Sequence, residues 1–265
     1  MERTVFFAKN INELLYQLKT TKDLSVVGGC TRIEKLPQKT VSIRLIPELC
    51  LISRHERYID FGPGVTLNEI LKLGEKHVPK VLYDAISTVA NPNVRNLATI
   101  GGNICEPHRH LTLFAPLLAL EAKLDIKNQN ESKTISLQNF KEIPEGYILT
   151  NIRIPLIDGD VSIFKRVGPE HSINQSSASF AFIAGTEKNS ITNIRMAFAG
   201  PFAFRNKDFE TSLIGKRLPL TQKDIQEIMK TSNDLFSKAS QDIMMTDVMR
   251  QQYLNMTRFA FEQLM

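Results

Sequence analysis

Apolar residues recur along this chain with two different spacings, which predict both helices and strands. The segment INELLYQLK has a helical spacing and directly follows Asn10, a residue suited to the N-cap. Its apolar face comprises Ile11, Leu14, Leu15 and Leu18. A second helix start is marked by Thr66, because Glu69 stands three residues later as the partner of a capping box. That helix would carry Leu67, Ile70, Leu71 and Leu73.

Shorter apolar runs, several of them alternating with polar residues, predict strands. These runs are 24–27, 40–45, 57–61, 122–126, 147–155, 162–167, 178–186 and 191–199. Further helices are expected at 78–89, with Pro92 marking the end of that segment, and at 113–120, 223–239 and 247–265. The polar segments 128–133 and 187–190 are typical of hairpin turns. The pattern as a whole predicts an α+β chain, with antiparallel strands and then helices in its last third.

Two glycine pairs follow β-like runs and are the candidate chemistry of the chain. The first lies in Val26–Ile33 (VVGGCTRI), and the second lies in Asn93–Ala122 (NVRNLATIGGNICEPHRHLTLFAPLLALEA). Adjacent glycines let the backbone turn with positive φ and bring bare amide groups close to a ligand. One such loop suits a diphosphate, and two of them suit a large dinucleotide.

These loops resemble those of the FAD-binding subunit of the molybdenum hydroxylases, the family of xanthine dehydrogenase, carbon monoxide dehydrogenase and nicotinate dehydrogenase. The family's first loop usually reads A-G-G-T/S-D or V-V-G-N-T, and its second reads T-I-G-G-N. A third block, Ile194–Leu218, is similar to the start of the family's C-terminal domain: a strand, a glycine, an aromatic or proline turn, an arginine, a helix and Gly-Lys. The three blocks occur in the family's order and cover nearly the whole chain.

The resemblance implies two domains. Residues 1–157 would form a two-lobed FAD-binding domain of the PCMH/VAO type, with lobes of roughly 1–55 and 56–157. Residues 158–265 would form a C-terminal domain of antiparallel sheet and helices, similar to that of the carbon monoxide dehydrogenase flavoprotein.

The resemblance also implies which residues hold FAD. The first loop would contribute Val26, Val27, Gly28, Gly29, Cys30 and Thr31. The second would contribute Thr99, Ile100, Gly101, Gly102 and Asn103. Outside the loops, Val89 would pack on the cofactor, Leu149 would pack on the isoalloxazine region and Lys165 would lie near the flavin ring. For Val89 the alternative is ordinary core packing, and for Lys165 it is a place on the surface of a strand.

The chain departs from the family after the second loop. Where the family has S-P-x-x-D, this chain reads EPHRHLT, which puts Thr112 at the position of the aspartate. A threonine still forms a hydrogen bond but brings no charge. The cluster of His108, Arg109 and His110 is not expected to bind a metal, because histidines two residues apart point away from each other. It would be a solvated loop, or else lie near the flavin phosphates or the NAD entrance.

Two arginines and a cysteine near the loops leave alternatives open. Arg32 is not the family's usual residue, and it either adds a cation near the diphosphate or faces solvent. Arg95 either reaches a phosphate or braces the second loop. Cys105 is expected to be a small buried hydrophobic residue rather than a redox-active thiol.

Composition and charge exclude several classes of function. The net charge of +5 suggests nucleic acid, but the basic residues are scattered, with no basic run longer than two and no interleaved aromatic residues. Three widely spaced cysteines cannot bind two [2Fe–2S] clusters, which need four thiolates each. With neither a membrane-length apolar run nor a signal-like N-terminus, a cytoplasmic protein is expected. The GxGxxG fingerprint of a Rossmann NAD site is also missing.

The function that the resemblance implies is electron transfer. The chain would carry FAD within a xanthine dehydrogenase-like heterotrimer, with a [2Fe–2S] iron–sulfur subunit and a molybdopterin-binding large subunit as partners and NAD+ or another acceptor as oxidant. No side chain of this subunit would act as a catalytic acid or base. The first alternative is a scaffold subunit on the same fold that lacks FAD. The second is a flavoenzyme that acts alone, such as a cell-wall precursor reductase.

Overall fold

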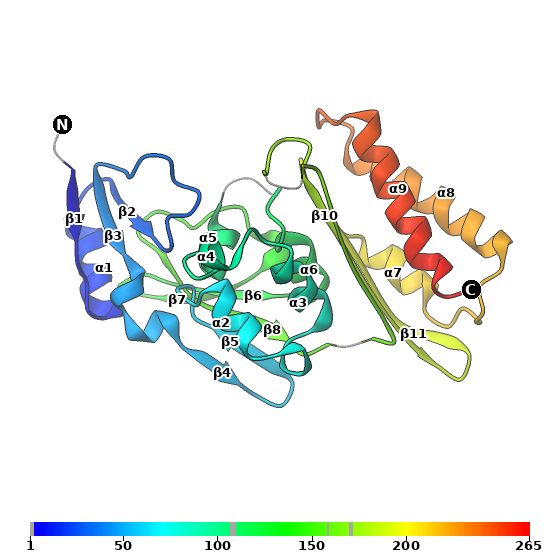
Figure 1. Cartoon of the computed structure of the whole chain (residues 1–265), viewed down its shortest axis with the longest axis horizontal. Coiled ribbons are helices and arrows are strands. Elements are labelled where there is room, and N and C mark those ends of the chain that lie inside the picture. The colour runs from blue at the N-terminus through cyan, green and yellow to red at the C-terminus, as the bar shows by residue number, and fades with distance from the viewer. Residues whose placement is uncertain (1–2, 107–109, 158, 170–171) are drawn as a thin grey trace. The chain divides into compact units, whose positions relative to one another are not determined.

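The computed structural model describes residues 3–106, 110–157, 159–169 and 172–265 (Figure 1). The internal contacts of the chain divide it into two units. The first comprises Met1–Val78, Val89–Pro107 and Glu121–Leu156, and the second comprises Pro79–Thr88, His108–Leu120 and Ile157–Met265. Two short segments that precede residue 157 therefore group with the C-terminal part of the chain. The predicted division into domains at residue 157 stays a prediction.

The first unit begins with a parallel sheet. Its strands are β1 (Thr4–Phe6), β3 (Lys39–Ser42) and β2 (Leu24–Val27), in that order across the sheet. Helix α1 (Ile11–Thr20) starts as predicted, because Asn10 accepts a hydrogen bond from the Glu13 amide at 2.9 Å. Its Leu14 and Leu15 join a buried core with residues of β3 and of the turns that follow it.

The predicted strand 40–45 ends early, at Ser42. The side chain of Ser42 accepts a hydrogen bond from the Arg44 amide at 3.3 Å and starts the 3-10 turn η1 (Ile43–Leu45). A second 3-10 turn, η2 (Pro47–Cys50), follows at once. Serine competes with the strand ladder through this local hydrogen bond, so the chain leaves the sheet there.

A five-stranded antiparallel sheet forms the other part of the first unit. Its strand order is β4 (Ile52–Arg54), β5 (Tyr58–Phe61), β8 (Ile148–Pro155), β6 (Lys123–Lys127) and β7 (Ser132–Ser136). Side chains alternate across it as the sequence pattern predicts. The buried face comprises Ile59, Phe61, Leu124, Ile126, Ile152 and Ile154.

The other face of this sheet carries an ordered ion pair. Asp60 accepts two hydrogen bonds from Arg153, both at 2.9 Å, and the Arg153 guanidinium lies 4.2 Å from the centre of the Tyr58 ring. Burial alone would raise the pKa of Asp60, but the hydrogen bonds from Arg153 and Asn151 outweigh it and lower that pKa. The carboxylate is therefore ionised over the physiological range.

Short helices connect the strands of the first unit. They are α2 (Leu67–Lys72), η3 (Glu75–His77), α4 (Pro92–Arg95), α5 (Ile100–Cys105) and η4 (Leu137–Asn139). The predicted capping box is present, with Thr66 and Glu69 bonded to each other's backbone amides. The expectation that Pro92 only ends a helix is wrong. Pro92 opens α4 at a position where its missing N–H costs nothing, and Asn91 caps that helix.

The second unit has three layers, with a four-stranded antiparallel sheet between two layers of helices (Figure 1). Its order is β12 (Ala203–Phe204), β11 (Ser190–Ala199), β10 (Ala178–Glu187) and β9 (Val161–Val167). Lys188 and Asn189 have φ of 50° and 58°, the conformation of a tight hairpin turn between β10 and β11. One face of the sheet is covered by α3 (Lys80–Ser87) and α6 (Phe114–Ala119). The other is covered by α7 (Lys207–Leu213), α8 (Gln222–Ala239) and α9 (Asp247–Glu262).

The helical side of this sheet holds an aromatic core. Phe236 of α8 and Tyr253 of α9 stack with ring centres 3.8 Å apart, and Phe198 of β11 meets both rings edge-on. The Tyr253 hydroxyl and the Ser232 hydroxyl are hydrogen-bonded at 2.7 Å, and burial raises the pKa of Tyr253 to about 12. None of the helices in the described part of the chain has the length and apolar character that crossing a bilayer requires.

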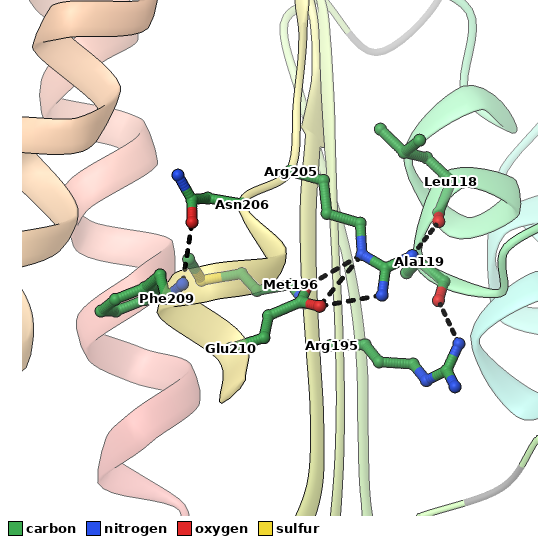
Figure 2. A network of polar contacts seen from close by, with 8 residues as sticks. All are labelled: Leu118, Ala119, Arg195, Met196, Arg205, Asn206, Phe209 and Glu210. Carbon is green, nitrogen blue, oxygen red and sulfur yellow. Dashed lines mark hydrogen bonds and ion pairs between the residues drawn. The ribbon is translucent and has the colours of Figure 1, made fainter. Parts of the chain in front are cut away.

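The third sequence block, Ile194–Leu218, contains a buried ion pair (Figure 2). Glu210 of α7 accepts hydrogen bonds from the Arg205 guanidinium at 2.8 and 2.9 Å and from the Met196 amide at 2.8 Å. Arg205 also donates to the Leu118 carbonyl at 3.0 Å. Because Leu118 lies in the last turn of α6, the cation offsets the negative end of that helix dipole. The arginine and the helix of this block thus join the two faces of the sheet.

Candidate functional site

The first glycine loop leaves the carboxyl end of β2 and lies against the second loop. A Cβ placed on Gly29 would lie 1.7 Å from the Leu97 carbonyl oxygen, and one placed on Gly28 would lie 2.7 Å from Thr99 Oγ1. Side-chain carbons do not approach other atoms so closely, so only glycine allows this backbone contact. The structure therefore brings the two predicted loops together within the first unit.

The first loop offers backbone N–H groups to a ligand. The amides of Gly29, Cys30 and Thr31 donate to no protein acceptor in the described part of the chain. Cys30 and Thr31 are exposed, and Cys30 has a left-handed φ of 55°. Successive amides around such a residue can form a concave site for an anion. This arrangement suits the predicted phosphate contact of the loop.

The second loop differs from its prediction. Gly101 and Gly102 lie in the first turn of α5, and neither has a positive φ. The amide of Gly102 donates to Oγ1 of Thr99, the N-cap, at 3.0 Å. The other amides of the turn donate to carbonyl oxygens in the pairs Ile100–Val65, Gly101–Pro63 and Asn103–Thr99. The expectation of bare amides on positive-φ glycines is therefore wrong for this loop.

Close packing explains the glycine at position 101. A Cβ there would lie 2.5 Å from Cβ and 2.6 Å from the carbonyl oxygen of Pro63. The segment 62–67 runs beside 98–101, with a bridge between Thr66 and Thr99. In the sequence alone, Gly62-Pro63-Gly64 is typical of a break after the strand 57–61. The two flanking glycines pack elsewhere, since a Cβ on Gly62 or Gly64 would lie 2.3 or 3.0 Å from the Leu49 carbonyl oxygen.

The second loop can contact a ligand through side chains. Asn103 is half-buried, and its side-chain amide forms no hydrogen bond with the described residues. The Thr99 hydroxyl lies where the two loops meet. Ile100 is fully buried, and Gly102 is exposed. A role of these residues in cofactor binding stays a prediction.

Arg95 braces the chain ahead of the second loop. Its Nη1 donates to the carbonyl oxygens of Val89 and Ala90, both at 2.8 Å. Ala90 has a left-handed φ of 44°, so the arginine fixes a strained turn. Of the two alternatives for Arg95, the structure favours bracing. Val89 is half-buried in that turn, and Arg32 is exposed.

The remaining predicted residues divide between the two units. Leu149 is buried in β8 of the first unit, whereas Thr112 and Lys165 belong to the second. Thr112 is buried, and the Lys165 ammonium lies 4.8 Å from the centre of the Phe259 ring. This contact agrees with the alternative for Lys165, a place on the surface of a strand. Their predicted cofactor contacts stay predictions.

The histidine cluster after the second loop falls mostly outside the described residues. Pro107, His108 and Arg109 are not among them. His110 has its Nδ1 at 2.8 Å from the Ser177 carbonyl oxygen, so this ring nitrogen carries the proton and donates. The described residues contain no group of three or more histidine, cysteine or acidic side chains that could hold a metal.

The cysteines differ in part from expectation. Cys105, predicted to be buried, is exposed at the end of α5. A six-residue helix buries only one face, here through Ile100 and Ile104, and Cys105 lies outside that face. Although Cys30 is exposed, partial desolvation raises the pKa of its thiol, so this cysteine is not an activated thiolate.

The arrangement fits FAD as the implied cofactor. The first loop has available amides, the second loop has an available carboxamide, and glycines hold the two loops in contact. A diphosphate needs such N–H donors, and FAD is long enough to use donors from two loops. That these residues bind the cofactor stays a prediction.

Comparison with known proteins agrees with this geometry. Residues 1–157 match the family described as the FAD binding domain in molybdopterin dehydrogenase. The glyceraldehyde dehydrogenase medium chain of Sulfolobus acidocaldarius is 26% identical over 192 residues, which cover 69% of this chain and 68% of that protein. The carbon monoxide dehydrogenase medium chain of Hydrogenophaga pseudoflava is 24% identical over 190 residues, covering 68% and 66%. An indole-3-acetaldehyde oxidase of Zea mays is 31% identical over 207 residues, and only 15% of its length is matched.

Solved structures share the fold across the whole chain. Carbon monoxide dehydrogenase from Hydrogenophaga pseudoflava superposes with a TM-score of 0.82 at 19% identity, covering 100% of this chain and 96% of that one. Quinoline 2-oxidoreductase from Pseudomonas putida 86 gives 0.79 at 15% identity, covering 100% and 95%. The predicted α+β fold is thereby confirmed. Through the match over residues 1–157, this chain belongs to the family of FAD-binding domains of the molybdopterin dehydrogenases, and its cofactor is FAD.

Proposed function

We propose that this chain is the FAD-carrying electron-transfer subunit of a multi-subunit molybdenum hydroxylase. The observation that carries the proposal is the contact between the two glycine loops, with the amides of Gly29, Cys30 and Thr31 left available to an anion. FAD, when bound, supplies both one-electron and hydride chemistry. The protein's own task is then to hold, orient and shield the cofactor, and this requires no acid or base side chain.

We assign the following roles to the predicted binding residues. The first loop, Val26–Thr31, would hold the diphosphate through its amides. Thr99 and Asn103 would add side-chain hydrogen bonds from the second loop. Val89 and Leu149 would contribute apolar surface, and Leu149 lies in β8. Thr112 would replace a charged hydrogen bond to the flavin by a neutral one, which is weaker.

The partners are inferred from relatives and from cysteine content. Two relatives are named as medium chains of dehydrogenases, and the term medium chain implies other subunits. Three cysteines cannot hold two [2Fe–2S] clusters, so these would belong to an iron–sulfur subunit, and the molybdenum cofactor to a large subunit. NAD+ or another acceptor would be the oxidant. The finer proposal is a cytoplasmic, xanthine dehydrogenase-like heterotrimer.

The experiment combines metal analysis with a reoxidation assay. The tagged chain is purified from its native cells without denaturant, and FAD, iron, acid-labile sulfide and molybdenum are measured per mole of chain. About one FAD, four iron and one molybdenum per chain are expected, because two [2Fe–2S] clusters hold four iron atoms. FAD without iron or molybdenum would contradict the multi-subunit proposal. For the acceptor, chemically reduced protein is mixed anaerobically with NAD+, and NADH is followed at 340 nm. Failure to form NADH would exclude NAD+ and leave another acceptor.

A further inference from the structure

Arg44 is a cation beside the first loop that no sequence motif points to. Strands β2 and β3 run parallel, and Val27 pairs with Ser42 at their carboxyl ends. The glycine loop follows Val27, and the η1 turn with Arg44 follows Ser42. Residues that follow neighbouring parallel strands leave the same edge of a sheet, which is where ligands of such sheets bind.

The backbone at Arg44 is fixed on a rigid turn. Its amide donates to Ser42 Oγ at 3.3 Å, its carbonyl oxygen accepts from Cys50 Sγ at 3.9 Å, and the Ile46 amide closes the turn on Ile43 at 3.1 Å. These hydrogen bonds fix the position from which the long Arg44 side chain extends. This distinguishes Arg44 from Arg32, which lies in the loop itself.

The charge of Arg44 reaches the loop and is not neutralised there. The Arg44 guanidinium acts to lower the pKa of the Cys30 thiol, against the larger effect of burial. Arg44 is exposed, and within the described part of the chain it forms no ion pair. The same edge of the sheet therefore presents the available amides of residues 29–31 and an unpaired guanidinium.

We propose that Arg44 is a diphosphate-binding residue, which supplies the positive charge for the FAD that residues 29–31 hold through their amides. A guanidinium offers a planar fork of donors that matches phosphate oxygens, and charge-assisted hydrogen bonds are about twice as strong as neutral ones. This assignment rests on the proposed FAD-binding function.

The test separates diphosphate binding from binding of the flavin ring. The full-length chain without cofactor is titrated with FAD, and with riboflavin as the probe that lacks phosphate. The variants are Arg44→Gln and Arg44→Lys. The control is Arg54→Gln, because Arg54 is also exposed and lies in β4 of the same unit. Since Arg44 is exposed, these changes are expected to leave the melting temperature unchanged.

Arg44→Gln is expected to weaken FAD binding by about 10-fold, as the loss of a charged hydrogen bond near solvent does, and to change riboflavin binding by less than about twofold. Arg44→Lys should recover part of the lost affinity, and Arg54→Gln should bind FAD as wild type does. The FAD dissociation constant of Arg44→Gln should depend less on salt than that of wild type. Wild-type FAD affinity in Arg44→Gln, or an equal loss for riboflavin, would overturn the assignment alone. A wild-type chain that binds no FAD would overturn the proposed function together with it.

Discussion

The Arg205–Glu210 ion pair allows a quantitative prediction for the second unit (Figure 2). Both side chains are nearly inaccessible, with 4% and 7% of their surfaces exposed. Arg205→Met would leave the Glu210 carboxylate buried with the Met196 amide as its remaining donor. Breaking a buried pair in this way costs about 3–5 kcal/mol, far more than the pair is worth against two apolar residues. The loss of the hydrogen bond to the Leu118 carbonyl adds to this cost.

The double variant Arg205→Met/Glu210→Leu tests the reasoning behind that magnitude. It removes both charges, so no carboxylate is left buried without its partner. The remaining cost is that of the Met196 amide, which loses its acceptor, at about 1–3 kcal/mol. The double variant should therefore be more stable than Arg205→Met alone, although it carries one more substitution. The matched control is Lys80→Ala, which removes an exposed pair with Asp84 and should change the stability by less than about 0.5 kcal/mol.

The assay is urea unfolding followed by circular dichroism, since the chain has no tryptophan to report by fluorescence. For a chain of this length each kcal/mol lowers the melting temperature by about 2–4 °C, so Arg205→Met should melt roughly 10 °C below wild type. A loss under 1 kcal/mol in Arg205→Met, or a double variant less stable than Arg205→Met, would contradict this prediction. The first result would mean that water solvates the remaining carboxylate, and the second that lost packing and hydrogen bonds outweigh the removal of the charge.

Three further predictions concern the first unit and the flavin. Gly101→Ala should lower the free energy of unfolding by about 2 kcal/mol or more, because its Cβ would lie 2.5 Å from Pro63 Cβ. Gly102→Ala, the control, should lower it by less than about 1 kcal/mol. Equal losses in urea unfolding would contradict the packing argument. The pKa of Asp60 is lowered in the folded protein, so its contribution of about 1 kcal/mol is present above the unfolded pKa near 3.8 and is lost as pH falls through the folded pKa. The stability difference between wild type and Asp60→Asn should therefore shrink below about pH 4, and a constant difference down to pH 2 would contradict this. Lys165→Ala should leave FAD bound but lower its reduction potential in dye equilibration, whereas an unchanged potential would leave the lysine as a surface partner of an aromatic ring.

Local signals in the sequence predicted much of the fold. Asn10 and the Thr66–Glu69 capping box lie where predicted, because a cap depends on residues within one turn. The strands of the second unit also agree. Their apolar runs are nearly continuous in β10, because helices cover both faces of this sheet. Position 42 was missed because a serine in a β-like run can either continue the strand or bond the next turn. Pro92 was misread because proline both stops and starts helices.

The site was predicted less completely than the fold. Both loops could be found from their glycines, but the reason for the second pair could not. Gly101 is required by Pro63, which is distant in sequence, and only the folded chain shows that the two touch. Arg44 was missed for the same reason, because its proximity to the first loop depends on the pairing of β2 with β3. Spacing along the chain carries no information about such neighbours.

The most direct test of the central claim is the flavin content of the purified full-length chain, measured from its visible spectrum and from the compound that heat releases. We expect absorption bands near ~375 and ~450 nm and about one FAD per chain, either as purified or after incubation with FAD. A colourless protein that takes up no added FAD would contradict the account. It would support a scaffold subunit on the same fold.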